Sequence, residues 1–243
     1  LYKKCQTAFR KFHDEPDHKE YTRIEYAYYL MAKAAGITMS ECRLFEENGK
    51  AHFMTKRFDR KGENGEKLHM QSLCALAHMD FNTPRMYSYE DAFHVMRQLK
   101  LPYTDFLQLY KRMIFNEYAK NYDDHTKNIS FLMDKKGVWQ LAPAYDVMFT
   151  ANIWENPSAA VHCLGLAGKH SHVTVNDLKE FGKDFGIKKC DEIISQVATA
   201  IGGFKGLCEK YNVHVDWVNK ISESLNMIFP QEHGQNLTNK FKI

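Results

Sequence analysis

Apolar residues recur at spacings of three and four from residue 68 onward, the period of amphipathic helices. This period predicts helices over residues 70–78, 88–99, 104–118, 174–186, 190–211 and 215–229, with a loosened turn at Gly202-Gly203. Ser88, Thr104 and Thr174 are the expected N-caps. Within 104–118 a broad apolar stripe is expected in the core, and its members are Phe106, Leu109, Tyr110, Met113, Ile114 and Tyr118.

The start of the chain has a different pattern. Residues 7–13 predict a short strand, and a charged loop follows. Thr22 and Glu25 have the spacing of a capping box, in which a threonine hydroxyl and a glutamate three residues later bond each other's backbone amides. A helix is therefore expected to begin at Thr22 and to end at Gly36, a residue suited to a left-handed cap.

Two pairs of strand-like runs are each joined by a turn sequence. Residues 42–46 and 51–57 flank Asn48-Gly49, the strongest short hairpin signal. Residues 129–133 and 138–141 flank a second turn that ends in Gly137. The whole pattern predicts an α+β chain, with a small, partly β segment over residues 1–60 and a mostly helical one over residues 61–243.

The composition is that of an ordinary globular protein, with 44% hydrophobic and 26% charged residues. A net charge of +3 is too small to indicate nucleic-acid binding. No apolar run approaches the length of a membrane span, and the start does not read as a signal peptide. The six cysteines never form C-x-x-C, so we expect reduced thiols in a soluble, cytoplasmic protein.

Three polar residues stand out around the second hairpin. Asp123 precedes Asn128 by five residues, the spacing of the protein-kinase catalytic loop D-x-x-x-x-N. In that loop the aspartate accepts the proton of the attacking hydroxyl and the asparagine holds magnesium, while a second acid further on grips the same metal. Asp146 is placed to be that acid, and Asp124 is a competing base that the spacing to Asn128 disfavours. The alternative interpretation of the bare spacing is a solvated polar turn.

The context of these residues resembles a known family. Residues 123–132, residues 139–146, the segment Lys56-Arg57-Phe58-Asp59-Arg60 and the early helix with Gly36 resemble, in this order, motifs of the HipA-like serine/threonine kinases. Those kinases are the toxins of bacterial type II toxin–antitoxin modules. The resemblance implies a two-lobed, protein-kinase-like α+β fold, with an incomplete small lobe here, and an enzyme that uses ATP and Mg²⁺.

The same resemblance implies roles for individual residues. Asp123 would be the catalytic base, with Asn128 and Asp146 as magnesium ligands. The residues implied in nucleotide binding are Lys11 and Glu25 (a lysine–glutamate pair), Lys56 and Phe58 (backbone to adenine), Asp59 (ribose), and His125 and Tyr145 (lining). Bland alternatives remain open: a surface lysine at position 11, a simple helix cap at position 25, and a charged turn after the first hairpin.

Partners also follow from the resemblance: a HipB-like helix-turn-helix antitoxin, DNA only through that antitoxin, and a protein substrate such as an aminoacyl-tRNA synthetase. One departure is the lack of the family's phosphate-binding loop, because the first glycine is Gly36. The loop is either absent, supplied by a partner such as a separate small-lobe subunit, or missing because nucleotide binds poorly. The alternative functions are a kinase-derived module that mainly binds an antitoxin or repressor, and a small-molecule kinase.

His170 and His172 alternate as on one face of a strand. With no obvious third ligand nearby, we expect surface histidines rather than a metal site.

Overall fold

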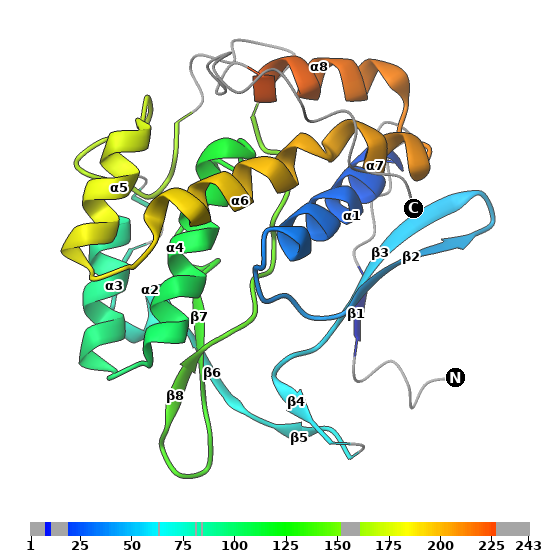
Figure 1. The fold of residues 1–243 in the computed structure, drawn as a ribbon. Helices are drawn as coiled ribbons and strands as arrows, with labels where there is room; N and C mark the ends of the chain where they lie inside the picture. Colours follow the sequence, from blue (N-terminus) through cyan, green and yellow to red (C-terminus); the bar gives the residue numbers. More distant parts are fainter. Residues whose placement is uncertain are drawn as a thin grey trace.

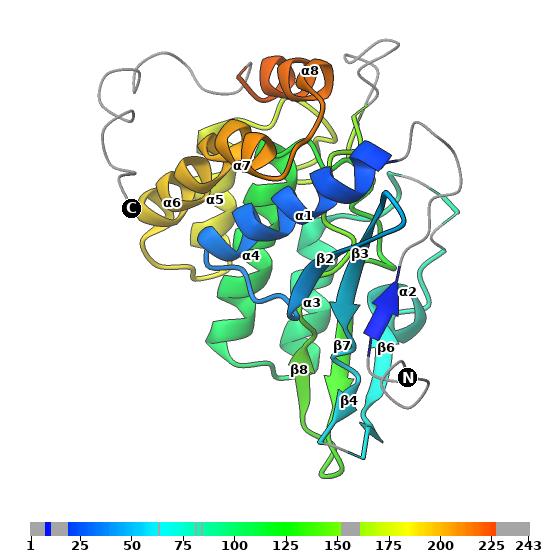
Figure 2. The same cartoon turned by 90° about the vertical axis from the view of Figure 1, so that its right-hand side faces the viewer.

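The computed structural model describes residues 8–10, 19–62, 64–80, 82–83, 85–151 and 161–226. Figures 1 and 2 show helices gathered on one side of the molecule and small sheets on the other. The chain is thus an α+β protein, as the periodicity predicted. No helix among these described residues is long and apolar enough to cross a membrane.

The first sheet packs beside the first helix. Its strands are β1 (Ala8–Arg10), β2 (Cys42–Glu47) and β3 (Lys50–Lys56), in the antiparallel order β1-β3-β2. The β2–β3 turn is Asn48-Gly49, and both residues have positive φ, +50° and +71°. Such values define the tight turn that favours Asn-Gly, so the predicted hairpin is confirmed.

Helix α1 (Lys19–Ala34) begins earlier than expected. Thr22 and Glu25 lie inside it and are only 1% and 2% exposed, so the predicted capping box at Thr22 is wrong. Tertiary burial of these polar residues outweighed the local capping pattern. The helix end is confirmed: Gly36 has φ +74° and donates to Lys33 O (3.0 Å), while Ile37 N–H donates to Ala32 O (3.0 Å).

The second hairpin gains a third strand that the sequence pattern missed. β7 (Ser130–Met133) and β8 (Trp139–Leu141) form the predicted pair, and β6 (His69–Ser72) joins the other edge of β7. The helix expected over 70–78 is therefore wrong in its first half, and only α2 (Leu73–Leu76) is helical. Pairing with β7 satisfies the β6 backbone better than one isolated helical turn would.

The remaining helices follow the predicted order. They are α3 (Tyr89–Gln98), α4 (Tyr103–Tyr118), α5 (Val175–Asp184), α6 (Cys190–Gly202), α7 (Phe204–Lys210) and α8 (Val215–Asn226), and a short ribbon of β4 (Arg60–Lys61) and β5 (Glu66–Lys67) lies near the two hairpins. Ser88 and Thr174 make capping boxes as expected. Thr104 does not cap α4, because Pro102 occupies the N-cap position without a side-chain bond.

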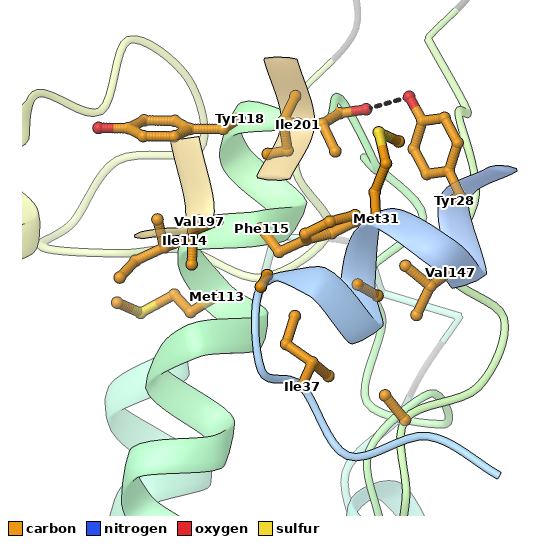
Figure 3. Close-up of a cluster of buried hydrophobic side chains, with 14 of the residues drawn as sticks. Tyr28, Met31, Ile37, Met113, Ile114, Phe115, Tyr118, Val147, Val197 and Ile201 are labelled. Carbon is orange, nitrogen blue, oxygen red and sulfur yellow. Dashed lines mark hydrogen bonds between the residues drawn. The ribbon is translucent and has the colours of Figure 1, made fainter. Parts of the chain in front are cut away.

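The core forms where α1, α4 and α6 meet (Figure 3). Five members of the predicted α4 stripe are buried, and Phe106 is partly buried against them. The Tyr28 hydroxyl of α1 donates to Ala119 O at 2.7 Å, immediately after α4 ends. This buried bond ties the first helix to the start of the loop that carries Asp123. Cys42, Cys74, Cys163, Cys190 and Cys208 are free thiols, in agreement with the expected reduced state.

The close approach of α5 to its neighbours depends on Gly182. A Cβ atom at this position would meet Cys190 Sγ and would lie 3.1 Å from the Tyr110 hydroxyl oxygen, both in packed surroundings. Gly182→Ala should therefore lower the free energy of unfolding by about 1–3 kcal/mol. Gly206→Ala is the matched control, because a Cβ there meets nothing within 4 Å and should stabilise its helix by about 0.5–1 kcal/mol. Urea denaturation of both variants tests this, and equal effects would contradict it.

Candidate active site

The loop after α4 presents Asp123 to solvent. Its side chain is 60% exposed. The backbone is fixed from behind, since Thr150 Oγ1 accepts from the amides of Tyr122 (2.7 Å) and Asp123 (3.1 Å). His125 Nε2 lies 3.7 Å from Asp123 Oδ1. A fixed backbone with a free carboxylate suits a group that must meet an incoming substrate.

Asn128 closes the same loop. Its side-chain Nδ2 donates to Asp123 O at 2.8 Å, and its backbone N–H donates to His125 O at 2.8 Å. With Nδ2 bound to the loop, the other amide atom, Oδ1, is the one left for a further ligand. Asn128 therefore both orders the loop and keeps an oxygen available for a cation.

Asp124 points the opposite way and is 3% exposed. Its carboxylate accepts from the Tyr89 hydroxyl (2.8 Å), from the Cys163 amide (2.8 Å) and from the Leu164 amide (3.4 Å), and its Oδ2 lies 2.9 Å from His162 Nδ1. These partners occupy the lone pairs that a general base would need. The geometry therefore favours Asp123 over Asp124 for chemistry and makes Asp124 the buried anchor of the loop.

His162 lies between two acids. Nδ1 faces Asp124, and Nε2 lies 2.9 Å from Glu117 Oε2 on α4. Burial by itself would lower the pKa of His162, but the carboxylates of Asp124 and Glu117 outweigh it and raise the pKa to about 9. The ring is thus an imidazolium at neutral pH.

Asp146 follows β8 in an unusual backbone conformation. It has φ +51°, in the left-handed region that few residues other than glycine adopt, although aspartate tolerates it best. Its neighbours Ala144 and Val147 are buried, and Ala144 N–H donates to Thr38 O at 2.8 Å. Buried flanks thus force the exposed Asp146 side chain outward, a form of local strain typical of functional sites.

Tyr145 joins this segment to the catalytic loop and to the segment after β3. Its hydroxyl donates to Lys127 O at 2.5 Å and lies 2.5 Å from Ser130 Oγ. Its ring stacks on Phe58 at a centroid distance of 5.5 Å. Three distant parts of the chain therefore meet at this one side chain.

A cavity beneath the loop collects several of these residues. Asn128, Tyr145 and Asp146 line it together with Tyr89, Leu109, Arg112, Asn116, Asn121, Asp124, Ile129, Ala144 and Val147. A carboxylate and an amide oxygen on one wall fit a hard cation such as Mg²⁺, which takes one or two carboxylates and completes its shell with water and phosphate oxygens. The donor set is chemically suitable for magnesium.

The other predicted nucleotide-binding residues are less clearly gathered. Glu25 is buried in α1 and does not line this cavity, and Lys11 lies outside the described residues. Lys56 is exposed, and its amide already donates to Glu41 O at 2.9 Å. Asp59 accepts from Arg57 at 2.8 and 2.6 Å, which lowers its pKa, so a ribose would share this carboxylate with a guanidinium.

Sequence reasoning missed the residues that support the site. Thr150, Tyr89, Glu117 and His162 contact the loop or its anchor from four separate segments. No spacing rule connects residues so far apart in the chain, so the only available signal was the second aspartate of the Asp-Asp pair. The expectation for His170 and His172 agrees with the structure: within the described ranges no three His, Cys, Asp or Glu side chains are grouped to hold a metal ion.

The raised pKa of His162 predicts a pH-dependent stability. Because the folded pKa is about 9 and the ordinary value is 6.5, the stabilisation is complete below pH 6.5 and is lost as the pH rises through 9. Between these limits the free energy of unfolding should fall by roughly 3 kcal/mol in the unmodified protein. His162→Gln should remove this component, and the exposed control His172→Gln should retain it. Urea titrations at several pH values test this, and an unchanged slope in His162→Gln would contradict it.

Comparison with known proteins places this geometry in a family. The model of the HipA-like C-terminal domain matches residues 2–203. No curated protein sequence matches the chain significantly. A chain in the complex of HipA, HipB and operator DNA from Shewanella oneidensis MR-1 superposes with a TM-score of 0.70 and 17% identity, over 91% of this chain and 57% of that one. The chain thus spans little more than half the length of that relative.

The kinase CtkA from Helicobacter pylori gives a TM-score of 0.48 at 12% identity, over 88% of this chain and 91% of that one, too weak a likeness to carry a conclusion. The stronger superposition confirms the expected α+β, kinase-like fold. With its model matched over most of the sequence, the chain belongs to the family of HipA-like C-terminal domains.

Proposed function

We propose that this protein is an ATP- and Mg²⁺-dependent serine/threonine protein kinase. The observation that carries the proposal is the division of labour in the loop after α4. Asp123 is exposed on a fixed backbone, Asn128 bonds its carbonyl, and Asn128 shares a cavity wall with Asp146. This is the set of groups that phosphoryl transfer requires: a base, and oxygen ligands for the cation that accompanies ATP.

In the proposed step a serine or threonine hydroxyl attacks the γ-phosphorus of ATP. The new O–P bond forms as the bond to the β-phosphate oxygen breaks and ADP leaves. Asp123 orients the hydroxyl and takes its proton, and the backbone bonds to Thr150 and Asn128 hold Asp123 in place. Most of the rate then comes from positioning rather than from covalent chemistry by the protein.

Asn128 and Asp146 would hold the magnesium. When bound, the cation neutralises the charge that develops on the phosphate oxygens. The left-handed backbone at Asp146 and the Nδ2 bond at Asn128 orient these two ligands before any nucleotide arrives. Such preorganisation avoids a reorganisation cost during transfer.

The nucleotide would lie between the end of β3 and the Asp146 segment. Support comes from the stacking of Phe58 on Tyr145, which links the segment expected to meet adenine to the segment that carries a metal ligand. Asp59 would bind the ribose by exchanging part of its contact with Arg57.

Substrate and partners are inferred from the relative. The similar Shewanella chain comes from a complex with HipB and operator DNA, which supports a HipB-like antitoxin as partner here, with DNA reached only through it. The substrate would be a translation component such as an aminoacyl-tRNA synthetase. The competing role is an antitoxin- or repressor-binding module that transfers no phosphate; a small-molecule kinase would use the same groups.

The first test is transfer of labelled γ-phosphate from Mg-ATP into a bacterial extract by the full gene product. Asp123→Asn should reduce labelling at least about 1,000-fold, because the amide cannot take the proton. Asp216→Asn, an exposed acid in the first turn of α8, is the matched control and should label normally.

A labelled protein band that depends on Asp123 supports the proposal. A labelled metabolite without a protein band would indicate the small-molecule kinase instead. Equal labelling by Asp123→Asn, or no labelling by any folded version, would contradict the proposal.

A second prediction concerns Asp146. Asp146→Asn should weaken ATP binding at least about 10-fold in the presence of Mg²⁺ while leaving metal-free ATP binding unchanged, because only the cation contact is lost. Isothermal titration with and without Mg²⁺ measures both affinities. Equal losses under the two conditions would indicate a disturbed pocket rather than a lost metal ligand.

A further inference from the structure

The structure assigns a positioning role in catalysis to His162, as the cation that locks the catalytic loop onto helix α4. This inference rests on the proposed kinase function and goes beyond it, because His162 is neither a base nor a metal ligand there. The lock consists of three side chains, Asp124, His162 and Glu117, and is called the Asp–His–Glu bridge below.

The bridge joins three segments that are distant in the chain. Asp124 belongs to the catalytic loop, Glu117 lies one residue before the end of α4, and His162 comes from the strip of residues 161–166. Both ring nitrogens are 2.9 Å from a carboxylate oxygen, and the His162 and Glu117 side chains are 4% and 12% exposed. The ring edge also packs on Tyr122, with centroids 4.7 Å apart and planes at 72°. These contacts leave the imidazole no room to rotate.

Charge is what this place requires. Asp124 and Glu117 are two acids in a poorly solvated interior, and an unneutralised pair would be costly to bury. The cation of His162 lies between them. The other titratable groups packed around the bridge are Tyr89 on Asp124, Tyr122 on the ring, Lys120 near Glu117, Cys163 near Asp124, and Lys169 on the wall of the adjoining cavity.

Neither lysine replaces the histidine. Lys169 Nζ bonds the carboxylate of Asp177 at 2.8 and 2.7 Å. Lys120 lies over the Tyr122 ring, 5.6 Å from its centroid. His162 is therefore the cation that contacts both acids directly.

The bridge fixes the residue next to Asp124, which is Asp123. The strip of 161–166 adds a backbone bond to the same place, from Cys163 N–H to Tyr122 O at 3.2 Å. If Asp124 turned or moved, the adjoining peptide would carry Asp123 with it, and displacements of about 1 Å can cost about 100-fold in rate. We therefore expect His162 to control turnover while leaving nucleotide contacts alone.

The test uses the full gene product with His162→Gln, which keeps a hydrogen-bond donor but has no charge. The turnover number should fall about 10- to 100-fold, while KM for ATP changes less than about 3-fold. His172→Gln, an exposed histidine on the same stretch of chain, is the matched control and should behave as the unmodified protein.

A rescue experiment separates charge from packing. Glu117→Gln added to His162→Gln removes the excess negative charge, so the double variant should recover at least about 5-fold of the lost turnover. A purely structural role predicts the opposite, because losing both contacts would be at least as damaging as losing one. A double variant no better than His162→Gln would overturn the charge argument.

Two readouts do not depend on activity. Nitrogen NMR of labelled histidine should show His162 as imidazolium at pH 7.5, and hydrogen exchange of the amides at 122–128 should accelerate at least about 10-fold in His162→Gln but not in His172→Gln. If the protein transfers no phosphate at all, the kinase proposal fails while these two readouts still decide whether the bridge locks the loop. A neutral His162, or unchanged exchange in His162→Gln, would overturn the inference.

Discussion

The buried carboxylate of Asp124 is the interaction on which the site depends. It gathers the Tyr89 hydroxyl, two backbone amides and the His162 ring around one side chain that is 3% exposed. Losing any of these partners would leave a charge buried without compensation, which is expensive in a protein interior. Because Asp123 is its immediate neighbour, the same constraint that buries one aspartate directs the other to solvent. Stability and presentation of the site thus have a common cause.

Local signals predicted those parts of the fold that local chemistry decides. The capping box at Ser88, the left-handed cap at Gly36 and the Asn48-Gly49 hairpin are all present. The errors lie where a distant contact overrides a local preference. Thr22 had the spacing of a cap but is buried inside α1, and residues 69–72 had a helical pattern but pair with β7. The division of the chain near residue 60 remains a prediction.

The candidate site divides along the same line. Asp123, Asn128 and Asp146 could be singled out because kinase chemistry requires those residue types in that order, and the structure places Asn128 and Asp146 on one cavity wall. Glu117 and His162 could not be singled out, since their importance arises only when the folded chain brings them to the second aspartate.

The account's central claim is that the loop of Asp123 and the segment of Asp146 form one site for a metal–nucleotide complex. Paramagnetic broadening by Mn²⁺ in the presence of ATP tests it most directly in the labelled protein. The account predicts selective, saturable broadening of the Asn128 side-chain amide and of the Asp146 backbone, and loss of this effect in Asp146→Asn. Saturable ATP binding with broadening confined to other parts of the chain would contradict it.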